Sequence, residues 1–246
     1  WNDLIPEDAT YPIGTPGGAP PSNIGYIKVG NKWSIGHNNR NLPKFSFSLD
    51  HLQLEADVPA PAPVPGLQPF DAVKAKLAAK QPVSILCLGD SITQGTSLAN
   101  ADQERYARVL ERLLRERLGY EEVTVLSRAV GGAQVNDLRL WAERDFVGVS
   151  PDLVIVMAGY NDKTWGYPAD YYGNALSDYL DRIAVRTGGK AAVLLMPPIP
   201  GRGPRFVMMD DYAEAVRALA ARRGVALCDM NAVFKAFGRE GLNAYM

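Results

Sequence analysis

This sequence of 246 residues contains few cysteines and histidines and no long apolar run. Its positive and negative charges are nearly balanced. The net charge is −1, so no basic surface is implied and nucleic acid is not expected as a partner. No apolar run reaches the roughly 18 to 20 residues that a membrane-spanning helix needs, which excludes a transmembrane segment. The two cysteines, Cys87 and Cys228, fall within apolar runs and are expected to be packed thiols, and we expect no metal or other cofactor.

The first residue is Trp1 rather than methionine, and no signal peptide is recognisable at the start. We therefore expect a processed protein or a piece of a longer one. A secreted or periplasmic location is expected, with the cytoplasm as the alternative. The oligomeric state is left open by the sequence.

A proline-rich stretch divides the chain. Residues 59–69 (PAPAPVPGLQP) begin with proline at alternate positions, which favours an extended, semi-rigid linker. Strand signals at 24–29 and 45–58 precede the linker, and residues 1–58 show no helical pattern. We predict a small all-β segment there, either packed on the main domain or forming the tail of a β-sandwich. The second domain is predicted over residues 70–246 and is expected to lack its C-terminal end.

Strand and helix patterns alternate after the linker. An unbroken apolar run such as LVIVMA is typical of a strand buried on both faces, whereas a period of 3.6 residues predicts a helix. The predicted strands are 83–88, 123–127, 153–158, 191–196 and 225–228. The predicted helices are 71–80, 101–118, 134–143, 169–186, 207–223 and 231–237. This alternation predicts a three-layer, flavodoxin-like α/β domain with a central five-stranded parallel sheet in the order 2-1-3-4-5.

Polar turns follow the first three predicted strands. They are Gly89-Asp90-Ser91, Val130-Gly131-Gly132 and Gly159-Tyr160-Asn161-Asp162. Strands two, one and three are neighbours in the predicted order, so the turns are expected to meet at one edge of the sheet. A serine nucleophile needs a base, and the oxyanion that it creates needs fixed hydrogen-bond donors. The backbone N–H groups of Ser91 and Gly132 and the side-chain amide of Asn161 fit that second need.

These three blocks resemble signature blocks of the SGNH hydrolases, also called GDSL-type esterases and lipases. The resemblance covers residues 81–246. It implies that Ser91 is the nucleophile and that Gly132 is an oxyanion donor, with Gly131 as a near alternative. It further implies that Asn161 is the other donor.

The family's fourth block, an Asp-x-x-His motif that supplies the acid and the base, has no match. The two histidines, His37 and His51, both precede the linker. We expect the block in a C-terminal segment outside these 246 residues. A pseudoenzyme and a base borrowed from one of the two histidines are the alternatives.

Three residues beside the predicted nucleophile are expected to contact the substrate, namely Asp90, Tyr160 and Trp165. Two of them have a second interpretation, because Asp90 is also suited to cap its turn and Trp165 to cover the core. We predict a serine esterase that releases a small acyl group, such as acetyl from a carbohydrate, through an acyl-enzyme. The alternatives are a lysophospholipase or thioesterase-type acyl hydrolase, and a non-catalytic carbohydrate-binding protein.

Overall fold

The computed structural model describes residues 10–12, 26–28, 63–201 and 209–238, and the chain divides into two compact units, residues 1–63 and 64–246. In the first unit, strand β1 (Thr10–Pro12) pairs antiparallel with strand β2 (Tyr26–Lys28). Strand β2 lies within the predicted run 24–29. The strand predicted at 45–58 lies outside the described residues.

A parallel sheet of five strands forms the centre of the second unit. Its strands are β3 (Val83–Gly89), β4 (Val123–Ser127), β5 (Leu153–Met157), β6 (Ala192–Leu195) and β7 (Ala226–Leu227). Their order in the sheet is β4-β3-β5-β6-β7, which confirms the predicted order 2-1-3-4-5. Every residue of β5 is buried, as its apolar sequence predicts.

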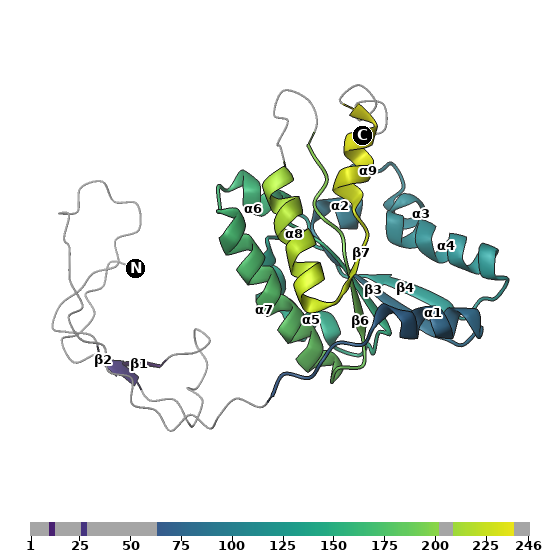
Figure 1. The fold of residues 1–246 in the computed structure, drawn as a ribbon, viewed down its shortest axis with the longest axis horizontal. Coiled ribbons are helices and arrows are strands. Elements are labelled where there is room, and N and C mark those ends of the chain that lie inside the picture. Colours follow the sequence, from purple (N-terminus) through teal and green to yellow (C-terminus); the bar gives the residue numbers. More distant parts are fainter. Residues whose placement is uncertain (1–9, 13–25, 29–62, 202–208, 239–246) are drawn as a thin grey trace. The chain divides into compact units, whose positions relative to one another are not determined.

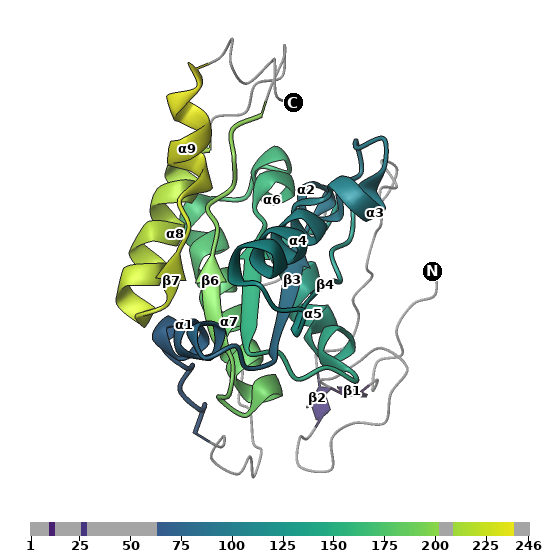
Figure 2. The ribbon, with the colours of Figure 1, turned by 90° about the vertical axis from the view of Figure 1, so that its right-hand side faces the viewer.

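Helices cover both faces of this sheet (Figures 1 and 2). The longer helices are α1 (Phe70–Ala78), α4 (Tyr106–Leu118), α5 (Val135–Phe146), α7 (Ala169–Thr187), α8 (Asp210–Arg223) and α9 (Met230–Ala236). Side chains alternate along a strand, so Leu86 and Leu88 pack with α5, α7 and α8, whereas Ile85 and Cys87 pack with α1 and α4. The result is the predicted three-layer α/β fold. No helix in the described ranges has the length and apolar character needed to cross a membrane.

Short helices follow the ends of the strands. They are α2 (Ser91–Gln94), α3 (Ala101–Glu104) and α6 (Tyr160–Thr164). The prediction of one continuous helix over 101–118 is wrong, because Arg105 has an extended backbone (φ −58°, ψ 142°) between α3 and α4. A Cβ on Gly95 would lie 3.0 to 3.4 Å from the side chains of Leu98, Ala101 and Arg105. The break therefore lets α3 fold back over the turn that ends α2.

Gly89 joins β3 to α2 at a point where no side chain fits. A Cβ at this position would lie 2.1 Å from the carbonyl oxygen of Met157 on β5, and 2.5 Å from Oγ1 of Thr93. The backbone oxygen belongs to the neighbouring strand and cannot move away without disrupting the sheet. Glycine therefore allows the turn that carries Ser91 to lie directly against β5.

Candidate active site

Ser91 is the first residue of α2, at the carboxyl end of β3. The preceding residue, Asp90, caps the helix, because its carboxylate accepts a hydrogen bond from the N–H of Ile92 at 2.9 Å. The turn closes where the N–H of Gly95 donates to the carbonyl oxygen of Ser91 at 2.9 Å. Ser91 is partly exposed, and no residue in the described part of the chain hydrogen-bonds to its hydroxyl. The hydroxyl is therefore available for chemistry at this edge of the sheet.

The glycine turn after β4 lies beside Ser91. It begins where the N–H of Val130 donates to the carbonyl oxygen of Gly89 at 3.1 Å. A Cβ on Gly131 would lie 3.8 Å from the Cβ of Ser91, so the turn passes within contact distance of the serine. Gly132 has a φ of +81°, which glycine adopts readily, and a Cβ there would meet nothing within 4 Å. A side chain at position 132 would thus point into open space.

Asn161 joins the third turn to the second. It lies in the first turn of α6, and its Nδ2 donates to the carbonyl oxygen of Ala133 at 2.9 Å. An amide nitrogen carries two hydrogens, so one remains for another acceptor. Figures 1 and 2 show α2 and α6 at the same end of the sheet. The structure therefore brings Ser91, the glycine turn and Asn161 to one edge, as the strand order predicts.

The three residues expected to contact substrate have different surroundings. Asp90 is only 1% exposed and its carboxylate caps α2, so the structure favours its interpretation as a turn cap. Tyr160 is partly buried and packs against the core cluster on the side of α5, α7 and α8. Trp165 follows α6 and is 74% exposed. Of the three, Trp165 presents the largest free surface to a ligand.

Two buried carboxyl groups lie behind the serine and the asparagine. The pKa of Asp90 is raised to about 6, chiefly by burial and with a smaller contribution from the charge of Asp162, against the lowering effect of the N–H of Ile92. Burial also raises the pKa of Asp162 to about 6, where the charge of Asp137 adds to the effect and the N–H of Val135 opposes it. Within the described residues neither carboxylate forms an ion pair with a basic side chain. Both groups are therefore costly to ionise in the folded chain.

The raised pKa of Asp90 predicts a pH-dependent stability. Its pKa is about 6 in the folded chain against 3.8 for a free side chain, so folding favours the protonated form. This stabilisation is complete below a pH of about 4 and is lost as the pH rises through about 6. The loss amounts to about 2 to 3 kcal/mol of unfolding free energy by neutral pH.

Asp90→Asn removes this titration but retains a side chain that caps helices well. Urea unfolding of both proteins at a series of pH values measures the effect. The unfolding free energy of the variant, relative to that of the wild type, should rise by about 2 to 3 kcal/mol as the pH increases from about 4 to about 7. A difference that stays constant over this range contradicts the raised pKa.

The sequence did not reveal the role of Asp162. Its carboxylate accepts from the N–H of Val135 at 3.1 and 3.2 Å, and the two residues are 27 positions apart. The acidic residue directly after the predicted donor Asn161 was the available signal, although its partner was not apparent. Among the described residues, no group of His, Cys, Asp and Glu side chains is placed to hold a metal ion.

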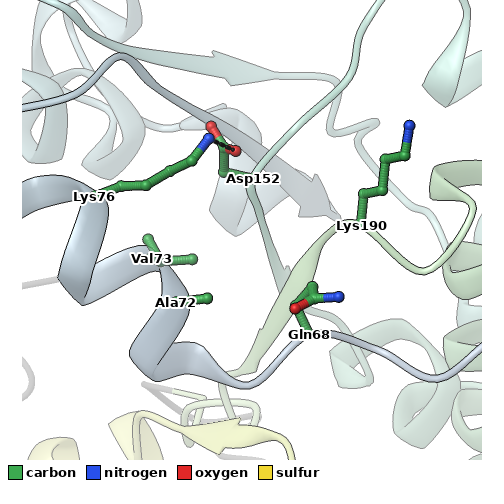
Figure 3. A pocket seen from close by; sticks show the side chains of 6 residues that line it. All are labelled: Gln68, Ala72, Val73, Lys76, Asp152 and Lys190. Carbon is green, nitrogen blue, oxygen red and sulfur yellow. Dashed lines mark hydrogen bonds and ion pairs between the residues drawn. The ribbon is translucent and has the colours of Figure 1, made fainter.

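A separate hollow of about 330 Å³ lies at the other end of the sheet (Figure 3). It is lined by Gln68, Ala72, Val73, Lys76, Asp152 and Lys190. Asp152 directly precedes β5, which places the hollow at the amino ends of the strands. Its carboxylate pairs with the ammonium group of Lys76 at 2.7 Å and also accepts from the N–H of Ser84 at 2.9 Å. The hollow is therefore not part of the site around Ser91.

Comparison with known proteins identifies relatives of the second unit. Residues 87–245 match the model of the GDSL-like Lipase/Acylhydrolase family. No curated protein matches the sequence significantly.

Several solved structures share the fold. A putative GDSL-like lipase from Parabacteroides merdae has a TM-score of 0.57 and 20% identity, over 66% of this chain and 84% of that one. An α/β hydrolase from the metagenome of Lake Arreo, Spain, has a TM-score of 0.51 and 25% identity, over 63% and 80%. An acetyl xylan esterase from Geobacillus stearothermophilus has a TM-score of 0.53 and 23% identity, over 63% and 79%.

Proposed function

The chain belongs to the GDSL-like lipase/acylhydrolase family that its three sequence blocks predicted, and from this premise we propose that it is a serine esterase that removes a small acyl group, such as acetyl, from a carbohydrate. The family supports the hydrolysis of a carboxylic ester. The observation that best supports the proposal is that the loops with Ser91, Gly131 and Asn161 lie side by side. A Cβ on Gly131 would lie 3.8 Å from that of Ser91, and Asn161 hydrogen-bonds to Ala133 in the same turn.

In the proposed reaction, Oγ of Ser91 attacks the ester carbonyl while a general base takes its proton. The N–H groups of Ser91 and Gly132 and the Nδ2 of Asn161 donate to the oxyanion of the tetrahedral intermediate. The intermediate collapses to an acyl-serine as the alcohol leaves with the proton. Water then attacks the acyl-serine in the same way and releases the acid.

The base is the one group that the described site does not contain. Residues 52–246 include no histidine, and both His37 and His51 lie outside the described residues. Imidazole in solution has the same proton-accepting group as a histidine side chain. Ester hydrolysis by this chain should therefore be assayed in the presence of imidazole. A protein-free solution measures the hydrolysis that imidazole causes by itself, and a Ser91→Ala chain measures the hydrolysis that does not depend on Ser91.

The size of the acyl group separates the proposal from its alternatives. We expect p-nitrophenyl acetate to be cleaved with at least about 10-fold higher kcat/KM than the octanoyl ester, a difference that corresponds to about 1.4 kcal/mol. A preference for the octanoyl ester instead supports a lysophospholipase or thioesterase-type hydrolase. If no ester is cleaved above the Ser91→Ala blank but acetylated oligosaccharides bind, the chain is a carbohydrate-binding protein and the esterase proposal is wrong.

Trp165 supports the carbohydrate part of the proposal. The residue is 74% exposed directly after α6, and an exposed indole ring provides a flat apolar face with a polar N–H. An acetyl xylan esterase is also among the solved structures of similar fold. We propose that a sugar ring of the substrate stacks on Trp165 while its acetyl ester lies at Ser91.

Trp165→Ala is expected to reduce kcat/KM for an acetylated xylo-oligosaccharide by about 5-fold, because one aromatic contact is worth about 1 kcal/mol. The kcat/KM for p-nitrophenyl acetate should not change, since this ester has no sugar ring. Leu140→Ala is the matched control, because Leu140 on α5 is 78% exposed and is equally free of core packing. Equal effects of Trp165→Ala on both esters would contradict a role in sugar binding.

A further inference from the structure

Two consecutive residues of α6 hold the loop that follows the glycine turn. Asn161 donates from Nδ2 to the carbonyl oxygen of Ala133 at 2.9 Å. Asp162 accepts from the N–H of Val135, with its two carboxylate oxygens at 3.1 and 3.2 Å. One side chain thus binds a carbonyl oxygen and the next binds an N–H two residues further along the same loop. The position of residues 133–135 is fixed from α6.

The contact made by Asp162 is buried and is not part of an ion pair. Asp162 is 1% exposed, and no lysine or arginine in the described part of the chain pairs with its carboxylate. Val135 is the first residue of α5, so its N–H has no acceptor within the helix. The N-terminal end of a helix also favours a nearby negative charge. A carboxylate at this position satisfies the N–H more strongly than a neutral acceptor would.

Gly132 is a central residue of a tight turn, which is closed where the N–H of Ala133 donates to the carbonyl oxygen of Val130 at 3.1 Å. This turn lies between two fixed points of the loop. On one side, the N–H of Val130 is bound to the carbonyl oxygen of Gly89. On the other side, Val135 is bound to Asp162. A Cβ on Gly132 would meet nothing within 4 Å, so the turn is not held in place by side-chain packing at this position. The tight turn orients the N–H of Gly132 relative to residues 130 and 133, and the residues that hold the two ends place the turn as a whole.

We propose that Asp162 is a positioning residue for ester hydrolysis, which holds Val135 and thereby keeps the N–H of Gly132 aimed at the oxyanion that forms on the Ser91 adduct. The inference rests on the proposed function, because it assumes that Gly132 donates to an oxyanion. Asp162 does not touch the substrate in this account. It acts through the backbone between residues 132 and 135.

Kinetics of Asp162→Ala and Asp162→Asn test the effect on catalysis. Misplacement of a catalytic group by about 1 Å can cost about 100-fold in rate, and we expect Asp162→Ala to lower kcat for p-nitrophenyl acetate by about that factor. The KM should change by less than about 3-fold, because the donor acts on the transition state rather than on the bound ester. Asp162→Asn retains an oxygen that can accept from Val135, so it should recover at least about 10-fold of the lost kcat.

Asp145 on α5 offers a matched control for Asp162. It is also a buried aspartate, with 0% exposure, and it lies near the C-terminal end of α5, where it accepts from the guanidinium of Arg144 at 2.7 and 2.8 Å. Asp145→Ala and Asp145→Asn remove a buried carboxylate without touching the glycine turn. We expect both to lower thermal stability and to keep kcat within about 3-fold of the wild type.

Hydrogen exchange tests the hold on the loop without any turnover. In Asp162→Ala, the N–H of Val135 loses its acceptor, so exchange in peptides spanning residues 130–137 should become at least about 10-fold faster. Peptides from β3 and β6 should exchange as in the wild type. In Asp145→Ala, the exchange rates of residues 130–137 should equal those of the wild type.

The two measurements separate failure of the inference from failure of the proposed function. Unchanged exchange over 130–137 and unchanged kcat in Asp162→Ala overturn the inference. An equal fall of kcat in the Asp162 and Asp145 variants also overturns it, because the effect is then one of general stability. If the wild type itself cleaves no ester above the Ser91→Ala blank, the proposed function fails and the assignment of Asp162 to hydrolysis fails with it. Faster exchange in Asp162→Ala would then show only that Asp162 holds the loop.

Discussion

Ser91→Ala should lower hydrolysis of p-nitrophenyl acetate by at least about 10³-fold relative to the wild type, after subtraction of the reaction that imidazole causes alone. The proposed route forms a covalent bond to Oγ of Ser91, and alanine has no atom that can form it. The remaining oxyanion donors can stabilise only a direct attack by water, which is a much slower reaction. Release of p-nitrophenolate, followed by its absorbance, measures the loss.

Ser84→Ala is the matched control for this variant. Ser84 lies near the amino end of β3, the strand that leads into the turn with Ser91. The backbone N–H of Ser84 donates to the carboxylate of Asp152. The replacement removes a hydroxyl from β3 and leaves that backbone bond intact. We expect wild-type activity from it. A Ser91→Ala chain that keeps wild-type activity would contradict the assignment of the nucleophile.

Asn161→Ala is expected to lower kcat by about 10² to 10³-fold, which corresponds to about 3 to 4 kcal/mol of transition-state stabilisation. Two effects contribute to this loss. The variant loses the Nδ2 donor to the oxyanion, and it also loses the bond to the carbonyl oxygen of Ala133 that holds the glycine turn. Because a donor to the oxyanion acts in the transition state, kcat should fall while KM changes little.

Asn231→Ala controls for the loss of a buried hydrogen bond. Asn231, at the start of α9, likewise donates from Nδ2 to a backbone carbonyl oxygen, that of Pro198, at 3.0 Å. Its replacement is expected to cost about 1 to 3 kcal/mol of stability and to leave kcat within about 3-fold of the wild type. If Asn161→Ala also keeps its kcat, Asn161 is not an oxyanion donor.

The fold was predictable because burial on both faces leaves a clear pattern in the sequence. The strand predicted at 153–158 corresponds to β5 at Leu153–Met157, and the strand predicted at 123–127 has the bounds of β4. The sheet order followed from the alternation of strands and helices. The break at Arg105 was not predictable in this way, because neither proline nor glycine marks it, and the side chain of Arg105 packs close to Gly95, ten residues earlier in the chain.

The site was predictable only in part. Local motifs at the ends of three strands indicated Ser91, Gly132 and Asn161, because each lies in a polar turn after an apolar run. The contact between Asp162 and Val135 joins positions that are 27 residues apart, and no local pattern encodes such a pair. For Asp90, the carboxylate is buried against the N–H of Ile92, which the sequence allowed but did not distinguish from an exposed position.

Covalent labelling tests the central claim, that Ser91 is the nucleophile, most directly. The 246-residue chain is incubated with an alkyl fluorophosphonate in the presence of imidazole, and the product is examined by intact mass and by peptide mapping. We expect one phosphonyl group per chain, on the peptide that contains Ser91, and none on the Ser91→Ala chain. Labelling of the Ser91→Ala chain to the same extent, or no label on Ser91 in the wild type, would contradict it.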